Sequence, residues 1–118
     1  MVDGKPKFLI VDDHAEFRRT LRAFLPPDAV ILECSDGEEA LACYAGHQPD
    51  WVLMDIEMRG MDGFTAARRL KETFPEAHII IISNHGEEEF RTEARDLGTA
   101  GFVHKAQLDE LHRFFPIN

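Results

Sequence analysis

Five polar side chains with complementary chemistry follow short apolar runs in this chain. Two acids end the run FLIV at 8–11, a third ends WVLM at 51–54, a serine ends IIII at 79–82 and a lysine follows GFVH at 101–104. These residues are Asp12, Asp13, Asp55, Ser83 and Lys105. Carboxylates are ligands that Mg²⁺ and Mn²⁺ prefer, and a hydroxyl and an ammonium group can bind phosphate oxygens. The set predicts a site for a divalent cation and a phosphoryl group.

Charge repulsion is the physical reason to expect a cation among the three acids. At an effective dielectric constant near 20, two unit charges 4 Å apart repel by roughly 4 kcal/mol. A divalent cation reverses that sign, and Mg²⁺ commonly binds one or two carboxylates together with phosphate oxygens. Taken singly, each of the five residues is more simply explained as a loop, turn or capping residue. Their joint occurrence after four separate apolar runs favours the site.

The intervening segments predict the fold that would bring these residues together. The apolar runs begin at residues 8, 29, 51, 78 and 101, and each is too short for a helix. Helices are predicted between and after them, at 17–25, 37–46, 64–74, 87–97 and 108–115, with prolines at 26, 75 and 116 as stops. Alternating strands and helices imply parallel strands with helices on both faces, a three-layer α/β sandwich of the (βα)5 type. Ligands bind such sheets beyond the carboxyl ends of the strands.

Composition limits the class of protein. The 118 residues suit one compact domain, and 22 acidic against 13 basic residues give a net charge of −9. That charge argues against direct contact with nucleic acid or an anionic membrane. The N-terminal MVDGKPK lacks the apolar core of a signal peptide, so we expect a cytoplasmic protein, with Cys34 and Cys43 as reduced packing residues.

The motifs VDDH, LMDIEMRGMDG, SNH and GFVHK occur in an order and spacing that resemble the receiver domain of two-component response regulators. The resemblance covers about residues 6–115. SNH followed by acidic residues is most similar to the nitrate and quorum-sensing regulators, which carry helix-turn-helix output domains. The resemblance to receiver domains implies a flavodoxin-like sheet with strands in the order 2-1-3-4-5, and a single receiver domain at 1–118. The implied partners are a sensor histidine kinase or phosphotransfer protein and an unidentified output domain or target. A second copy of the chain is a further possible partner, in a homodimer.

The same resemblance implies a role for each acid. Asp55 would accept a phosphoryl group from a kinase histidine. Mg²⁺, or Mn²⁺ in its place, would be bound by Asp13 directly, by Asp12 directly or through water, by the Asp55 carboxylate and by the Glu57 backbone carbonyl. The domain would catalyse its own phosphorylation and dephosphorylation without being a turnover enzyme.

Three further residues are implied to transmit the signal. Lys105 would pair with the acceptor carboxylate and then with the phosphate, and Ser83 would move toward a phosphoryl oxygen. Phe102 stands at the position of the family's switch aromatic and would turn inward, unless it is a plain core residue. A partner would then read the surface formed by segments 87–97, 101–104 and 108–115.

The chain departs from the family pattern at several positions. Ala106 replaces a common proline, which predicts either a cis Lys105–Ala106 bond, at a cost of about 3 kcal/mol, or a reshaped loop. Arg59 replaces another frequent proline. Glu57 and His85 would flank the path of the attacking water and tune the phosphoryl lifetime, or would simply be solvated. His14 is either a solvated loop residue or close to the metal.

Two other functions compete with the signalling switch. A small phosphatase of the haloacid dehalogenase type also uses an aspartate at a strand end, but it needs a second aspartate where this chain has Glu57. A degenerate receiver that only docks on proteins is the other alternative. The complete set of five polar residues argues against it.

Overall fold

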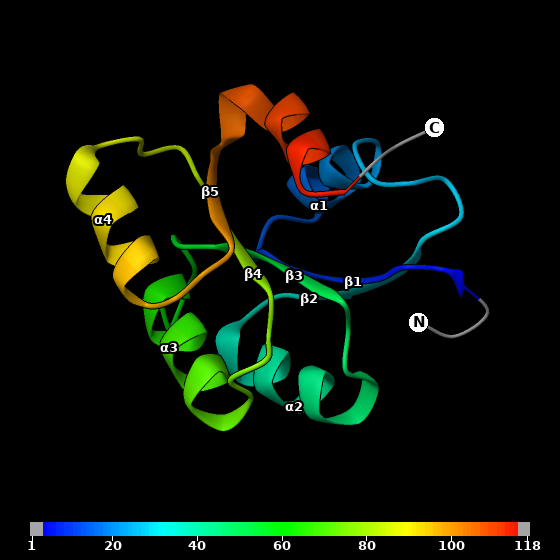
Figure 1. Cartoon of the computed structure of the whole chain (residues 1–118), viewed down its shortest axis with the longest axis horizontal. Coiled ribbons are helices and arrows are strands. Elements are labelled where there is room, and N and C mark those ends of the chain that lie inside the picture. Colours follow the sequence, from blue (N-terminus) through cyan, green and yellow to red (C-terminus); the bar gives the residue numbers. More distant parts are fainter. Residues whose placement is uncertain (1–3, 116–118) are drawn as a thin grey trace.

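The computed structural model describes residues 4–115 and shows one parallel sheet flanked by helices (Figure 1). The five strands are paired in the order β2-β1-β3-β4-β5. They are β1 (Lys7–Val11), β2 (Val30–Cys34), β3 (Trp51–Asp55), β4 (Ile79–Ser83) and β5 (Gly101–His104). Every pairing is parallel. The predicted α/β sandwich and the implied strand order are therefore confirmed.

A helical segment follows every strand, as the alternation of sequence patterns predicts. These segments are α1 (Ala15–Arg22), α2 (Gly37–His47), α3 (Gly63–Thr73), α4 (Glu88–Asp96) and η2 (Lys105–Arg113). Helix α1 and the segment η2 cover one face of the sheet, while α2, α3 and α4 cover the other (Figure 1). Alternating strand residues supply both cores: Leu9 and Val11 face α2 to α4, and Phe8 and Ile10 face α1 and η2.

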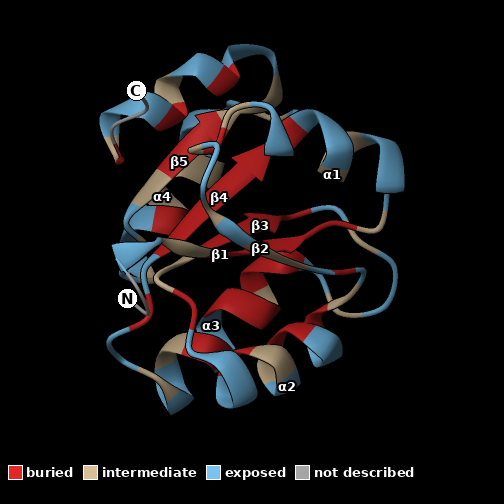
Figure 2. Cartoon of the chain, turned by 90° about the vertical axis from the view of Figure 1, so that its right-hand side faces the viewer, coloured by how far each residue is buried: buried red, intermediate tan, exposed pale blue. Residues whose placement is uncertain are grey.

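Strand β4 shows why this sheet needs two helical layers. All five of its residues are buried, including Ser83, because the strand lies between β3 and β5 with helices on both sides. Figure 2 shows β4 in the red of buried residues, the edge strand β2 largely in tan and pale blue, and the outer surfaces of the helices largely in pale blue. Because β4 is packed on both faces, the position of its last side chain, Ser83, at the edge of the sheet is fixed.

Local hydrogen bonds explain where several helices begin and end. The Asp36 side chain accepts a bond from Glu39 N at the start of α2, and the Asp62 side chain accepts one from Thr65 N at the start of α3. Gly98, with φ of 80°, follows α4 and donates its N–H to the Arg95 carbonyl. Gly98 therefore ends α4 with a left-handed residue, as glycines commonly do after a helix.

The fifth predicted helix differs from the expectation. Residues 105–113 form a 3₁₀ helix, and Gln107 interrupts it with φ of −133° and ψ of 46°. The His104 ring accepts a bond from Ala106 N at 3.0 Å, which turns the chain directly after β5. Every peptide bond among residues 4–115 is trans, so the predicted alternative of a cis Lys105–Ala106 bond is wrong. The predicted stop at Pro116 lies outside the described residues.

Both cysteines are free thiols packed in or against the core between the sheet and α2. The pKa of the Cys34 thiol is raised to about 12, mainly by burial and then by the neighbouring Cys43. A thiol that stays protonated is a weak nucleophile, so the packing role predicted for Cys34 is supported. Within residues 4–115, no helix has the length and apolar character needed to cross a bilayer.

Candidate functional site

The carboxyl ends of the four adjacent strands β1, β3, β4 and β5 bring the predicted polar residues together. Lys105 Nζ lies 3.4 Å from Asp12 Oδ2 and 3.4 Å from Asp55 Oδ1. Asp12, Asp13, His14 and Asp55 each present one potential metal ligand atom, and these atoms all lie within 4.8 Å of one another. The structure thus joins residues that are as much as 93 positions apart in sequence.

Burial makes this cluster electrostatically unusual. Asp12 and Asp55 are only 1% and 2% exposed, and Ser83 is fully buried. The pKa of the Asp55 carboxyl is raised to about 6, first by burial and then by the Asp12 carboxylate, although the Lys105 ammonium group acts in the opposite direction. One lysine therefore stands close to two buried carboxylates and compensates their charge only in part.

Two oxygen atoms in the cluster have no hydrogen-bond partner among the described residues. They are Asp55 Oδ2 and Asp13 Oδ1, and both atoms are buried. His14 Nδ1 lies 2.9 Å from Asp13 Oδ1 but does not meet hydrogen-bond geometry with it. Buried carboxylate oxygens without partners are costly, and an oxygen-binding divalent cation would satisfy them. The donor set therefore fits Mg²⁺ or Mn²⁺.

The loop after β3 is held against this cluster by backbone contacts. Arg59 N donates to Asp13 Oδ2 at 3.2 Å, and Glu57 N donates to Asp55 Oδ1 at 3.3 Å. Gly63, at the start of α3, is required by close packing, because a Cβ there would lie 2.1 Å from the Asp55 carbonyl oxygen. The Glu57 contact orients the Asp55 carboxylate, and the close packing of Gly63 holds the backbone at the end of β3.

Glu57 and His85 meet across the edge of the sheet. His85 Nε2 lies 2.7 Å from Glu57 Oε1, and the two side chains are 44% and 57% exposed. The same loop after β4 is tied to Ser83, whose Oγ accepts a bond from His85 N at 2.8 Å. The sequence predicted both residues at the same edge of the sheet but did not predict that their side chains touch.

Phe102 is 9% exposed and belongs to the core between the sheet and α2 to α4. The guanidinium carbon of Arg91 lies 4.7 Å from the centre of its ring, and Arg91 Nε donates to the Gly86 carbonyl at 3.2 Å. Arg91 therefore links the loop after β4 to the ring of Phe102, a contact that sequence analysis did not anticipate.

Phe17 and Arg18 also contact the site, although the sequence did not predict it. The Phe17 ring lies 4.2 Å from Lys105 Nζ, and an Arg18 N–H donates to the backbone carbonyl of Asp12. Both residues lie four to five positions after the acidic pair, which was the available signal, but periodicity identified Phe17 only as a core-facing residue. Phe17 shields the lysine from one side, and Arg18 fastens α1 to the end of β1.

A family model described as the response regulator receiver domain matches residues 8–115 of this chain. The chain belongs to this family. The receiver domain is 31% identical to the transcriptional regulatory protein DegU of Brevibacillus brevis. The match covers 87% of this chain and 45% of DegU, so the chain spans less than half of that relative. It is 36% identical to the chemotaxis protein CheY of Bacillus subtilis over 84% of each protein.

A solved structure supports the same assignment. A two-component response regulator of the LuxR family from Aurantimonas is 31% identical to the receiver domain, with a TM-score of 0.86 over 93% of this chain and 81% of that one. The predicted likeness to that subgroup of regulators is confirmed. The receiver domain is a phosphorylation-based signalling switch and not a metabolic enzyme, which argues against the phosphatase alternative. Response regulator receiver domains interact with histidine kinases or phosphotransfer proteins.

Proposed function

We propose that Asp55 accepts a phosphoryl group from a sensor histidine kinase or phosphotransfer protein in the presence of Mg²⁺. One observation carries this assignment. Asp55 Oδ1 is within reach of Lys105 and Glu57 N, while Oδ2 of the same buried carboxylate has no hydrogen-bond partner among residues 4–115. A fixed carboxylate with one unpartnered oxygen is suited to act as a nucleophile.

The proposed metal ligands are Asp12, Asp13, the Asp55 carboxylate and the Glu57 backbone carbonyl. When bound, Mg²⁺ would offset the charge of the carboxylates and of the phosphoryl oxygens. The cluster of Asp12, Asp13 and Asp55 supports this, because it places three acidic side chains around one position next to unpartnered oxygens. Mn²⁺, which accepts the same oxygen ligands, is the alternative ion.

The remaining residues of the site act on the phosphoryl group. As the bond between Asp55 and phosphorus forms, the bond from phosphorus to the donor imidazole nitrogen breaks, and the electron pair stays on that nitrogen. Lys105 is within 3.4 Å of both buried carboxylates, so it can follow the added charge by a small movement. The Ser83 hydroxyl, which now accepts a bond from His85 N, can donate its own hydrogen to a phosphoryl oxygen.

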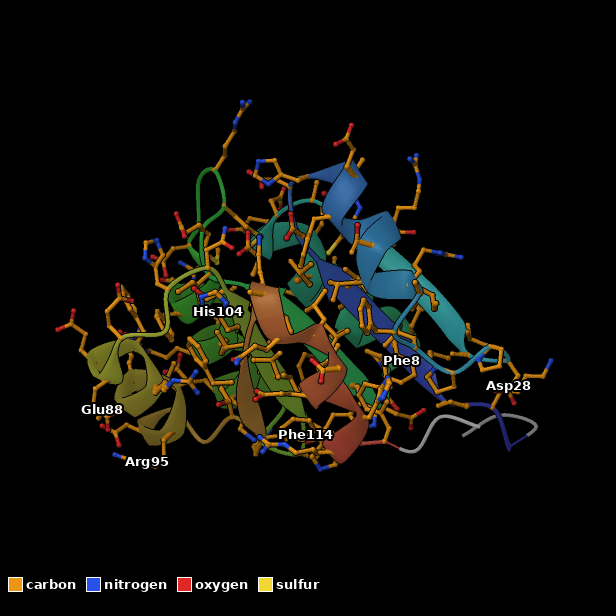
Figure 3. All side chains as sticks on the ribbon, turned by 90° about the horizontal axis from the view of Figure 1, so that it is seen from above. Phe8, Asp28, Glu88, Arg95, His104 and Phe114 are labelled. Atoms are coloured by element: carbon orange, nitrogen blue, oxygen red, sulfur yellow. The ribbon has the colours of Figure 1, made fainter. Side chains whose placement is uncertain are left out.

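The proposed output surface comprises α4, β5 and η2. Phosphorylation adds charge and acceptor oxygens beside Ser83, and a shift of the loop after β4 would move Arg91 and let the ring of Phe102, now 9% exposed, turn fully inward. Figure 3 shows α4, with Glu88 and Arg95 labelled, at one side of the molecule and the loop with Asp28 at the opposite side. Glu88 and Arg95 are exposed, so this surface is accessible to a target.

Phosphorylation of the purified chain tests the function. Incubation with acetyl phosphate and Mg²⁺, followed by mass spectrometry of the intact protein and its peptides, should show one phosphoryl adduct on Asp55. The Asp55→Asn variant, checked for folding by circular dichroism, should show none. An adduct that persists in this variant contradicts the assignment. Turnover of a phosphate ester would favour the phosphatase, and no reaction would favour the receiver that only docks.

A further inference from the structure

His14 is an imidazole in the acidic cluster that the proposed phosphorylation chemistry does not use. Its Nδ1 atom lies 2.9 Å from Asp13 Oδ1 and 3.3 Å from Asp12 Oδ1. It contributes a ligand atom to the group that also includes Asp55, in which all four atoms lie within 4.8 Å. The side chain is 69% exposed, so no apolar packing explains why the ring stands over the acids.

The backbone fixes the start of this side chain at the site. His14 N donates to Asp12 Oδ1 at 2.7 Å, and the His14 carbonyl accepts from Arg18 N at 3.1 Å as α1 begins. Arg18 also donates to the Asp12 carbonyl. His14 is thus held between the end of β1 and the first turn of α1, and only its side-chain torsions remain free to adjust the ring.

We propose, on the basis of the phosphorylation site argued above, that His14 is a metal ligand that makes this site prefer late first-row divalent ions such as Co²⁺ and Zn²⁺ over Mg²⁺. Imidazole nitrogen suits these ions, whereas Mg²⁺ prefers oxygen and retains water. A second observation also points to a missing ligand: Asp55 Oδ2 is buried without a hydrogen-bond partner among residues 4–115, and Asp55 is only 2% exposed.

The dimensions of the cluster fit such an ion. Nitrogen and oxygen ligands bind zinc at about 2.1 Å in tetrahedral geometry, so two of its ligand atoms stand about 3.4 Å apart, and His14 Nδ1 already lies 2.9 Å and 3.3 Å from an oxygen of Asp13 and of Asp12. The four ligand atoms lie within 4.8 Å of one another, and the exposed His14 ring is free to adjust its own distance to the acids by rotation. A bound late transition ion would stand where the metal of the phosphorylation site stands, so it would replace Mg²⁺ rather than add a second site.

A different role for His14 must be separated from this one. A protonated imidazole among Asp12 and Asp13 would act as a counter-ion and would compete with any metal. The two roles predict opposite effects of replacing the ring. A ligand increases affinity for the late transition ions selectively, whereas a counter-ion lowers affinity for Mg²⁺ and Co²⁺ alike.

Titration with single metals distinguishes these roles. Binding of Co²⁺ and of Mg²⁺ is measured by calorimetry for the wild-type chain, His14→Gln and the control His47→Gln, an exposed histidine at the end of α2. Loss of residues outside the direct ligand set commonly weakens metal binding by about 10- to 100-fold, so loss of His14 should weaken Co²⁺ binding at least about tenfold. Mg²⁺ binding should change less than about twofold, and the control should match wild type. The Co²⁺ complex should also lose a hyperfine-shifted imidazole proton signal in His14→Gln only.

Three outcomes would overturn the proposal: unchanged Co²⁺ affinity in His14→Gln, equal losses for Co²⁺ and Mg²⁺, or tighter binding of both ions. Urea denaturation of each variant without metal shows whether the folded state is retained. Phosphorylation of Asp55 by acetyl phosphate with Mg²⁺ is measured in parallel on the wild-type chain. If no adduct forms but His14→Gln still loses Co²⁺ affinity selectively, only the proposed function is contradicted. If the adduct forms but His14→Gln leaves the metal preference unchanged, only the role of His14 is contradicted.

Discussion

His85 Nε2 lies 2.7 Å from Glu57 Oε1, so the loop after β4 and the loop after β3 are joined by a side-chain contact at the edge that contains Asp55. Ser83 Oγ accepts from His85 N, which connects this contact to the buried serine of the site. Both side chains are partly exposed. We expect this contact to hinder the approach of water to the proposed phosphoryl group.

Breaking this contact should shorten the lifetime of the phosphorylated state. Glu57→Ala and His85→Ala each remove the contact, and an exposed ion pair contributes up to about 1 kcal/mol, which corresponds to about a fivefold faster dephosphorylation. Because both substitutions remove the same contact, the double variant should be no faster than the faster single variant. The loss of phosphoryl adduct is followed with time after the phosphodonor is removed.

Glu87→Ala is the matched control, because Glu87 lies on the other side of His85, with its Oε1 3.7 Å from Nδ1. Its dephosphorylation rate should stay close to that of wild type. If Glu57→Ala and His85→Ala stay within about twofold of wild type, the pair has no role in the lifetime.

The meeting of Asp55 and Lys105 could be predicted from sequence because it follows from topology. Parallel strands place their carboxyl ends at one edge, so an acid after one strand and a lysine after another must approach each other. The helical type of residues 105–113 was not predictable, since apolar residues at Leu108, Leu111 and Phe115 suit both an α-helix and a 3₁₀ helix. The kink at Gln107 depends instead on the turn at His104.

Contacts between side chains from distant segments could not be predicted. The approach of Phe17 to Lys105, at 4.2 Å, depends on how α1 crosses the sheet, and no periodicity encodes that angle. The position of the His14 ring depends in the same way on torsions that follow from packing. The sequence therefore predicts the strands, the helices and the chemistry of the sheet edge. It does not predict which neighbouring side chains touch the site residues.

Replacing Asp55 by asparagine should stabilise the metal-free protein at neutral pH. The pKa of Asp55 is raised in the folded state to about 6 from 3.8, so the folded protein binds this proton more tightly than the unfolded chain does. Stability therefore falls as pH rises between these two values, and the loss is complete above the higher one. The shift corresponds to a loss on the order of 2 to 3 kcal/mol, which Asp55→Asn avoids.

Urea denaturation with a chelator present measures this difference at several pH values. The stabilisation of Asp55→Asn should be largest at about pH 7.5 and should vanish near pH 3.5, where the wild-type carboxyl is protonated in both states. Asp109→Asn, at an exposed position of η2, should stay within about 0.5 kcal/mol of wild type. A stabilisation of Asp55→Asn that does not depend on pH would contradict the electrostatic cause.

Alanine at two helical glycines should have opposite effects. At Gly63 a Cβ would meet the Asp55 carbonyl oxygen at 2.1 Å and the Ile56 Cα at 2.5 Å, both backbone atoms that cannot move aside easily. Gly63→Ala should destabilise the fold by about 2 kcal/mol. At Gly46, in α2, nothing lies within 4 Å of the added atom, so Gly46→Ala should stabilise by about 0.5 to 1 kcal/mol. Chemical denaturation of both variants gives the two free energies, and equal effects would show that the contact at Gly63 is readily relieved.

Addition of Mg²⁺ should raise the stability of the wild-type chain through Asp13. An ion that binds only the folded state stabilises it by about 2.7 kcal/mol at 100 times its dissociation constant. In Asp13→Asn the amide oxygen can still accept from Arg59 N, which donates to Asp13 Oδ2 at 3.2 Å, so the loop contact is retained while one negative charge is lost. The gain from Mg²⁺ should then largely disappear, whereas the metal-free stability should change little. Denaturation curves with Mg²⁺, with chelator and with sodium chloride of the same ionic strength separate specific binding from screening. An equal gain in wild type and Asp13→Asn would show that the ion binds elsewhere.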